Sequence, residues 1–64
     1  MNKAILRIKD VSRRTGLARS TIYEMMDTGT FPRPVKLGPR QVGWVEGEVD
    51  SWIAARIEER DKAA

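Results

Sequence analysis

The chain has 64 residues, and its twelve Lys and Arg outnumber its nine Asp and Glu to leave a net charge of +3 at pH 7. A chain this short forms one domain, expected here over 1–64 with a core at about 5–60, and a partner would help to stabilise so small a core. It contains no cysteine and no histidine. Disulfides and the usual structural zinc sites are therefore excluded, and we expect no cofactor.

No segment of the sequence is suited to a membrane. No apolar run approaches the ~20 residues that cross a bilayer. The first seven residues, Met1–Arg7, lack the long apolar stretch of a signal peptide. We therefore expect a soluble protein of the cytoplasm that makes no membrane contact.

The charge is unevenly distributed along the chain. Residues 1–45 hold nine basic and three acidic side chains, whereas residues 46–64 hold three basic and six acidic ones. Eight of the twelve cations are arginines, whose planar guanidinium suits forked contacts to phosphate or guanine. Charge alone leaves two alternatives open, a surface that faces a polyanion and an ordinary solvated surface.

The first expected elements are a short strand and a helix. Residues 5–8 form a β-like run that could pair at a sheet edge. From Lys9 the apolar pattern becomes helical, and Gly16 is expected to end the helix because a positive φ is cheap for glycine.

A second helix is expected from about Arg19 to about Thr28. Its apolar residues fall at helical spacing on one buried stripe, Ile22, Met25 and Met26. Two short helices joined by the tight connection 16–18 form the layout of a helix-turn-helix.

A β-hairpin is expected next. Two prolines in Phe31-Pro32-Arg33-Pro34 forbid a helix and favour an extended path. Residues 35–37 and 42–45 then read as strands joined by turn residues 38–41, which gives a hairpin with a basic tip, or wing.

A third helix is expected from 46–48 to about Arg60. Its apolar face carries Val49, Trp52, Ile53 and Ile57, and its acidic start suits the helix dipole. Strand and helix spacing place Trp44 and Trp52 in the core rather than in a stacking site for bases.

The order of these motifs is more specific than any one of them. It comprises Leu6-Arg7-Ile8, Val11, Thr15-Gly16-Leu17, Arg19-Ser20-Thr21-Ile22-Tyr23, Gly29, Phe31-Pro32-Arg33-Pro34-Val35-Lys36-Leu37-Gly38, Arg40, Trp44, Glu48-Val49 and Trp52-Ile53. Over about 5–56 the chain resembles the AlpA family of prophage regulators. The resemblance implies a mainly α fold with a small β-hairpin, a winged helix-turn-helix of the MerR and excisionase type with three helices plus a wing. It also implies binding to DNA near prophage genes.

The chain departs from this family at one position. Ala18 stands where relatives usually have Ser as the N-cap of the second helix. Loss of a side-chain cap costs a helix ~1 kcal/mol, which affects local stability rather than the fold.

The first turns of the second helix are the leading candidates for contact with DNA, because this part of a helix-turn-helix enters the major groove. Arg19 can fork to guanine or phosphate, and Ser20, Thr21 and Tyr23 can bond a base edge or the backbone. The structural alternatives are a solvated helix start for Arg19, capping for Ser20 and Thr21, and half-burial of Tyr23 under the hairpin.

Further candidates lie on the first helix and the wing. Helical spacing separates Arg13 and Arg14 by ~100°, so one of them could be solvated or paired with an acid such as Asp10. The wing offers Lys36, Arg40 and Gln41 to phosphates or a minor groove, and Arg33 is a weaker candidate between its prolines.

We therefore expect a transcriptional regulator of prophage or mobile-element genes that binds double-stranded DNA sequence-specifically. One alternative is an excisionase that binds and bends DNA, and another is an adaptor that binds only proteins. A second copy of the chain, an integrase and RNA polymerase are candidate protein partners. We expect no catalytic residues, because serine and threonine have no histidine to act as base and the carboxylates are explained by a helix start.

Overall fold

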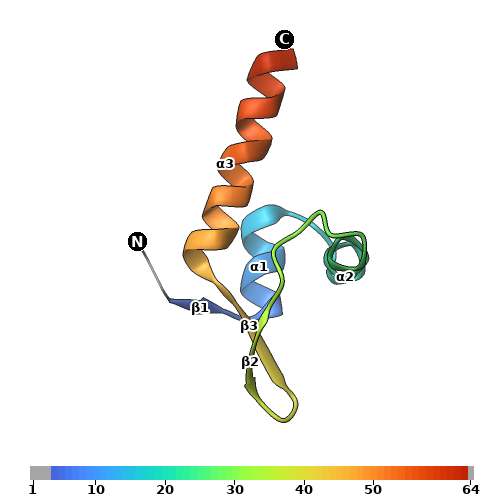
Figure 1. Ribbon diagram of the computed structural model, residues 1–64, viewed down its shortest axis with the longest axis vertical. Coiled ribbons are helices and arrows are strands. Elements are labelled where there is room, and N and C mark those ends of the chain that lie inside the picture. Colours follow the sequence, from blue (N-terminus) through green and yellow to red (C-terminus); the bar gives the residue numbers. More distant parts are fainter. Residues whose placement is uncertain (1–3, 64) are drawn as a thin grey trace.

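The computed structural model describes residues 4–63 (Figure 1). Residues 1–3 and 64, part of the domain expected over 1–64, lie outside the described residues. The elements follow in the order β1 (Ile5–Leu6), α1 (Ile8–Thr15), α2 (Arg19–Asp27), β2 (Val35–Gly38), β3 (Gln41–Val45) and α3 (Glu46–Ala63). The predicted fold is confirmed, since the three helices and the antiparallel hairpin form a winged helix-turn-helix.

The three strands form one small antiparallel sheet with β3 in the centre. Leu6 of β1 faces Trp44, and Val35 of β2 faces Gly43. The first strand is therefore an edge strand, as predicted, but it ends before Ile8, which begins α1 instead. The helix can begin there because the Asp10 carboxylate accepts the backbone N–H of Arg7 over 3.2 Å.

The turn between α1 and α2 is held by local hydrogen bonds. Gly16 has a φ of 74°, and its N–H closes the end of α1 on the Ser12 carbonyl over 2.9 Å. The Ser12 hydroxyl donates to the carbonyl of Leu17 over 2.7 Å, and the Leu17 N–H donates to the Thr15 hydroxyl over 3.2 Å. These bonds set the direction in which α2 leaves the turn.

The core lies where α1, α2 and α3 meet β3. Six apolar side chains are buried: Leu6, Val11, Ile22, Phe31, Trp44 and Val49. The indole of Trp44 also donates to the Pro32 carbonyl over 3.0 Å, which fastens the proline-rich segment to the hairpin. Trp44 is thus a core residue as predicted, and Phe31 joins it although the spacing of the sequence did not place it there.

The last helix is only partly attached to this core. Val49 is buried and Trp52 and Ile53 are half-buried, but every residue from Ala54 to Ala63 is exposed. Ile57, which was predicted on the apolar face, is 46% exposed, so the apolar face is not buried at this turn of the helix. The helix rises beyond the body, where no other element lies beside it, and it continues past Arg60 to Ala63 (Figure 1). Within residues 4–63 no helix has the length and apolarity needed to span a membrane.

Candidate nucleic-acid interface

The first turns of α2 present polar side chains outward while the same helix holds the core. Ile22 is completely buried, whereas Arg19 and Ser20 are exposed, Thr21 is half-buried and Tyr23 is 45% exposed. Tyr23 therefore keeps nearly half of its surface exposed to solvent. The helix can offer these side chains to a ligand without disturbing the core.

The N-terminus of α2 has no side-chain cap. Ala18 has the extended backbone of an N-cap residue, with φ −67° and ψ 153°, but no side chain accepts the first amides of the helix. Neither Ser20 nor Thr21 makes a side-chain hydrogen bond among the described residues, so the capping alternative has no support in this part of the chain. Uncapped amides and the helix dipole favour a negatively charged group here.

Arg13 and Arg14 differ sharply in their surroundings. The Arg14 guanidinium pairs with the carboxylate of Glu46 and with Asp50 Oδ1, the latter over 3.2 Å. Arg13 is exposed and forms no ion pair within residues 4–63. The pair that the sequence suggested for one of the two, with Asp10, is replaced by acids of α3. Arg14 therefore links α1 to α3 and is a poor candidate for ligand contact.

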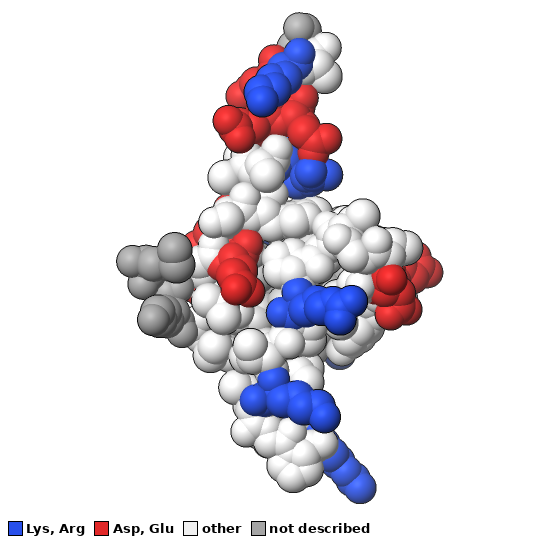
Figure 2. Space-filling model, viewed as in Figure 1, with Lys and Arg blue, Asp and Glu red and all other residues white. Residues whose placement is uncertain are grey.

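The hairpin supplies a second group of exposed polar side chains. Lys36 lies on β2 opposite Val42, Gln41 starts β3, and Arg40 lies in the turn between the strands. All three are exposed, as is Arg33 in the segment that leads into β2. From Thr28 to Val45 the sequence has three cations and no acid. In Figure 2 the charged side chains on the hairpin, at the bottom of the view, are all Lys and Arg. Asp and Glu gather over α2 and over residues 54–63, which we call the free part of α3.

A shallow cleft lies between α2 and the hairpin. It has a volume of about 380 Å³ and is lined by Met26, Asp27, Arg33, Pro34, Lys36 and Val42. We call it the α2–wing cleft. It brings together Arg33 and Lys36, two predicted site residues. It also includes Asp27, which sequence reasoning missed because no local pattern relates the end of a helix to a later strand.

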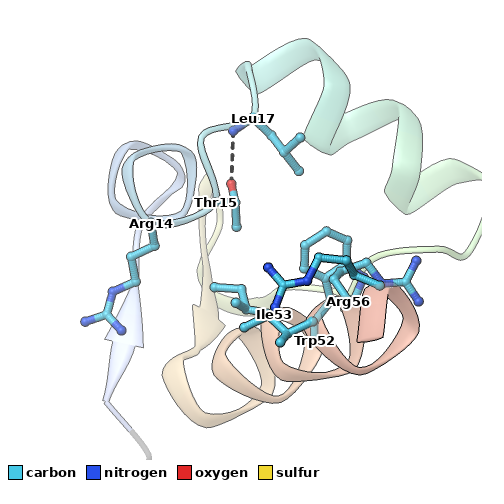
Figure 3. A pocket seen from close by; sticks show the side chains of 8 residues that line it. Arg14, Thr15, Leu17, Trp52, Ile53 and Arg56 are labelled. Atoms are coloured by element: carbon cyan, nitrogen blue, oxygen red, sulfur yellow. Dashed lines mark hydrogen bonds between the residues drawn. The ribbon is translucent and has the colours of Figure 1, made fainter. Parts of the chain in front are cut away.

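A second hollow, between the end of α1 and α3, has a different character. Its volume is about 330 Å³, and Leu17, Trp52 and Ile53 form much of its wall (Figure 3). Arg56 lies over the Trp52 ring at 5.5 Å and also pairs with Glu59. Arg60, the third arginine of this hollow, pairs with Asp61. All three arginines are thus already paired within the chain, and Arg14 is the only predicted site residue among the lining residues.

Comparison with known proteins identifies the family. Residues 4–57 match the family described as prophage CP4-57 regulatory protein (AlpA). The chain is 46% identical to an uncharacterised protein, ORF88, of Enterobacteria phage P4 over 57 residues, which are 89% of this chain and 65% of that protein. It is 41% identical to the DNA-binding transcriptional activator AlpA of Escherichia coli (strain K12) over 58 residues, which are 81% of this chain and 83% of that protein. The chain therefore belongs to the AlpA family of prophage regulatory proteins.

Proposed function

We propose that this chain is a sequence-specific regulator of transcription that binds double-stranded DNA of prophage or mobile-element genes. The observation that carries the proposal is the outward presentation of Arg19, Ser20 and Tyr23 on a helix whose inner face is buried. The printed name of the E. coli relative, a DNA-binding transcriptional activator, supports the same function. Such a protein would work on the nucleoid, in the cytoplasm.

The first turns of α2 enter the major groove in this proposal. Arg19 forks to a guanine edge or a phosphate, Ser20 and Thr21 bond base edges or phosphates, and Tyr23 packs against the backbone. Arg13 contacts a phosphate beside the groove. We leave Arg14 out because Glu46 and Asp50 hold its guanidinium.

The wing reaches the adjacent groove or the backbone. Arg40 and Gln41 are at its tip, and Lys36 and Arg33 approach phosphates from its base. A single module of this kind buries only ~600–1,000 Å² of protein surface on DNA. High specificity therefore requires a second copy of the chain, or a protein such as an integrase or RNA polymerase on the same DNA.

The test is binding to DNA duplexes by fluorescence anisotropy across a salt series, with random and prophage upstream sequences. We expect binding that weakens steeply with salt, because released counterions drive it. Arg19→Ala should reduce the preference for one sequence by about 1–3 kcal/mol, the value of a good base contact. Lys62→Ala is the matched control, since it removes the same charge from an exposed site at the end of α3.

The outcomes separate the proposed regulator from its rivals. If no duplex binds even at low salt, the proposed DNA-binding function is wrong, and an adaptor that binds only proteins becomes the favoured function. If the protein binds tandem sites and bends them strongly in a circular-permutation assay, an excisionase role is favoured. A reporter gene whose output changes with the wild type but not with Arg19→Ala supports regulation of transcription.

A further inference from the structure

We infer that the α2–wing cleft seats one phosphate of the DNA backbone, held jointly by Arg33 and Lys36. This inference rests on the proposed function and assigns a chemical group to a cleft of this chain. The two cations lie three residues apart, Arg33 in the proline-rich link and Lys36 on β2, and both line the cleft between α2 and the hairpin.

The cleft lies where the backbone of a bound DNA strand would pass. When α2 lies in one groove and the wing reaches the next, the feature of DNA between them is the sugar-phosphate backbone that separates the two grooves. The cleft has one wall from the last turn of α2, with Met26 and Asp27, and the other from the hairpin, with Lys36 and Val42. A strand that runs between the two elements therefore passes over this cleft.

The two cations are held ready for a phosphate. Pro32 and Pro34 flank Arg33 and restrict its backbone, and the Trp44 indole fastens Pro32 to the hairpin. Lys36 lies within the ladder between β2 and β3. Neither side chain forms an ion pair within residues 4–63, so a phosphate would not have to displace an acid from them. An arginine can fork to two phosphate oxygens while a lysine adds a point charge.

Asp27 lowers the affinity of the cleft for a phosphate. Its carboxylate lines the same cleft and has no ion-pair partner within residues 4–63. A carboxylate beside a phosphate repels it, so Asp27 limits the affinity of this contact on every sequence. Asp27→Asn, which keeps the shape of the side chain, should tighten binding by about 2- to 5-fold on random and preferred duplexes alike at low salt.

The decisive variant is the double substitution Arg33→Ala with Lys36→Ala. Its matched control is Arg60→Ala with Lys62→Ala, which removes the same two charges from exposed positions at the end of α3. Both doubles lower the net charge from +3 to +1. Since each neutralised phosphate adds ~0.9 to the slope of log affinity against log salt, loss of one shared phosphate should lower the slope by ~0.9. The affinity should fall about tenfold near 0.1 M salt. The control double should leave the slope unchanged.

A second readout locates the phosphate. A preferred duplex carries one neutral methylphosphonate at a time along both strands. We expect that a methylphosphonate at one position between the two contacted grooves lowers the affinity of the wild type about as much as the double substitution does. The same methylphosphonate should not lower the affinity of the double variant any further. Circular dichroism melts of the variants should match the wild type, because Arg33 and Lys36 are exposed.

The results distinguish failure of this inference from failure of the proposed function. If the wild type binds no duplex, both are wrong. If the wild type binds and the double variant keeps its slope, the cleft seats no phosphate although the protein binds DNA. A fall in slope of ~1.8 would mean two separate phosphates rather than one shared seat, and would overturn the inference as well.

Discussion

Neighbouring arginines can have different structural roles, as Arg13 and Arg14 illustrate. Both carry the same charge, and helical spacing turns them ~100° apart. Arg14 points to α3, where it pairs with Asp50 and with Glu46, a residue only 8% exposed. Arg13 points to solvent. The ion pairs of Arg14 join the start of the domain to its last helix.

This difference predicts different effects on stability. Arg14→Ala removes the guanidinium that faces the largely buried Glu46 carboxylate. It should lower the free energy of unfolding by about 1–2 kcal/mol, less than for a fully buried pair because the Arg14 side chain is 41% exposed. Urea unfolding checks this value. Arg13→Ala is the control and should change stability by less than about 0.5 kcal/mol. Equal effects of the two substitutions would contradict the assigned role.

At the scale of elements, the start of α2 lacks a side-chain cap and the centre of the sheet has no space for a Cβ atom at Gly43. The N-cap residue before α2, Ala18, has the extended backbone of a cap but no side-chain acceptor. Strand β3 carries Gly43, where a Cβ atom would lie 2.3 Å from Ile5 Cγ2 and 3.1 Å from the Leu6 carbonyl oxygen. The start of α2 therefore lacks a side-chain acceptor that would stabilise it, whereas β3 has no space for a Cβ atom at Gly43.

The missing cap predicts a stabilising substitution. Ala18→Ser places a hydroxyl at a residue whose φ and ψ are those of an N-cap, so the hydroxyl can accept an orphan amide at the start of α2. We expect a gain of about 1 kcal/mol in the free energy of unfolding, measured by urea or thermal unfolding. A loss of stability would show that the amides at this end are already satisfied by other means.

The crowded glycine predicts the opposite effect. Gly43→Ala forces β1 and β3 apart, because the Leu6 carbonyl is backbone and cannot rotate away. It should destabilise the protein by about 1–3 kcal/mol, the usual cost of overpacking. Gly38→Ala is the control, since its nearest neighbour is the end of the Gln41 side chain at 3.9 Å. Similar melting temperatures for both variants would contradict the packing of β1 on β3.

At the scale of the whole molecule, the domain is elongated, with extents of 44 × 27 × 19 Å. The hairpin and the free part of α3 lie at opposite ends of the long axis (Figure 1). The charges follow the same axis, with the cationic hairpin at one end and three of the six acids of α3, Glu58, Glu59 and Asp61, towards the other (Figure 2). A polyanion that approaches the hairpin end therefore meets the fewest acids.

This arrangement predicts that the free end of α3 is dispensable for folding. Deletion of residues 58–64 removes only exposed side chains among those described, so the free energy of unfolding should change by less than about 0.5 kcal/mol. The deletion removes three acids and two cations, which raises the net charge from +3 to +4. DNA binding at low salt should therefore become slightly tighter, and anisotropy measures it. A large loss of stability would mean that this part of α3 contributes to the core.

The sequence by itself determined the features that depend on neighbouring residues. Local sterics account for the positive φ of Gly16 and for the turn at Pro39 and Arg40, and helical spacing accounts for the buried position of Ile22. The ordered motifs also predicted the family, because their spacing reflects a whole fold. The residues proposed to contact DNA were predicted from the sequence, and the structure adds the exposure and the neighbours of each side chain.

Only the tertiary structure decided which distant residues meet. The partners of Arg14 lie on α3, and the cleft joins Asp27 to Arg33 and Lys36, which no local period relates. Helical spacing put Ile57 on the apolar face, but burial needs a second surface, and the body of the domain ends before that turn of α3. Phe31 shows the converse, since it lies in a loop with no periodicity and is nevertheless buried in the core, with its ring centroid 4.8 Å from that of Trp52. Periodicity assigns a face to each element, whereas the path of the chain decides what that face meets.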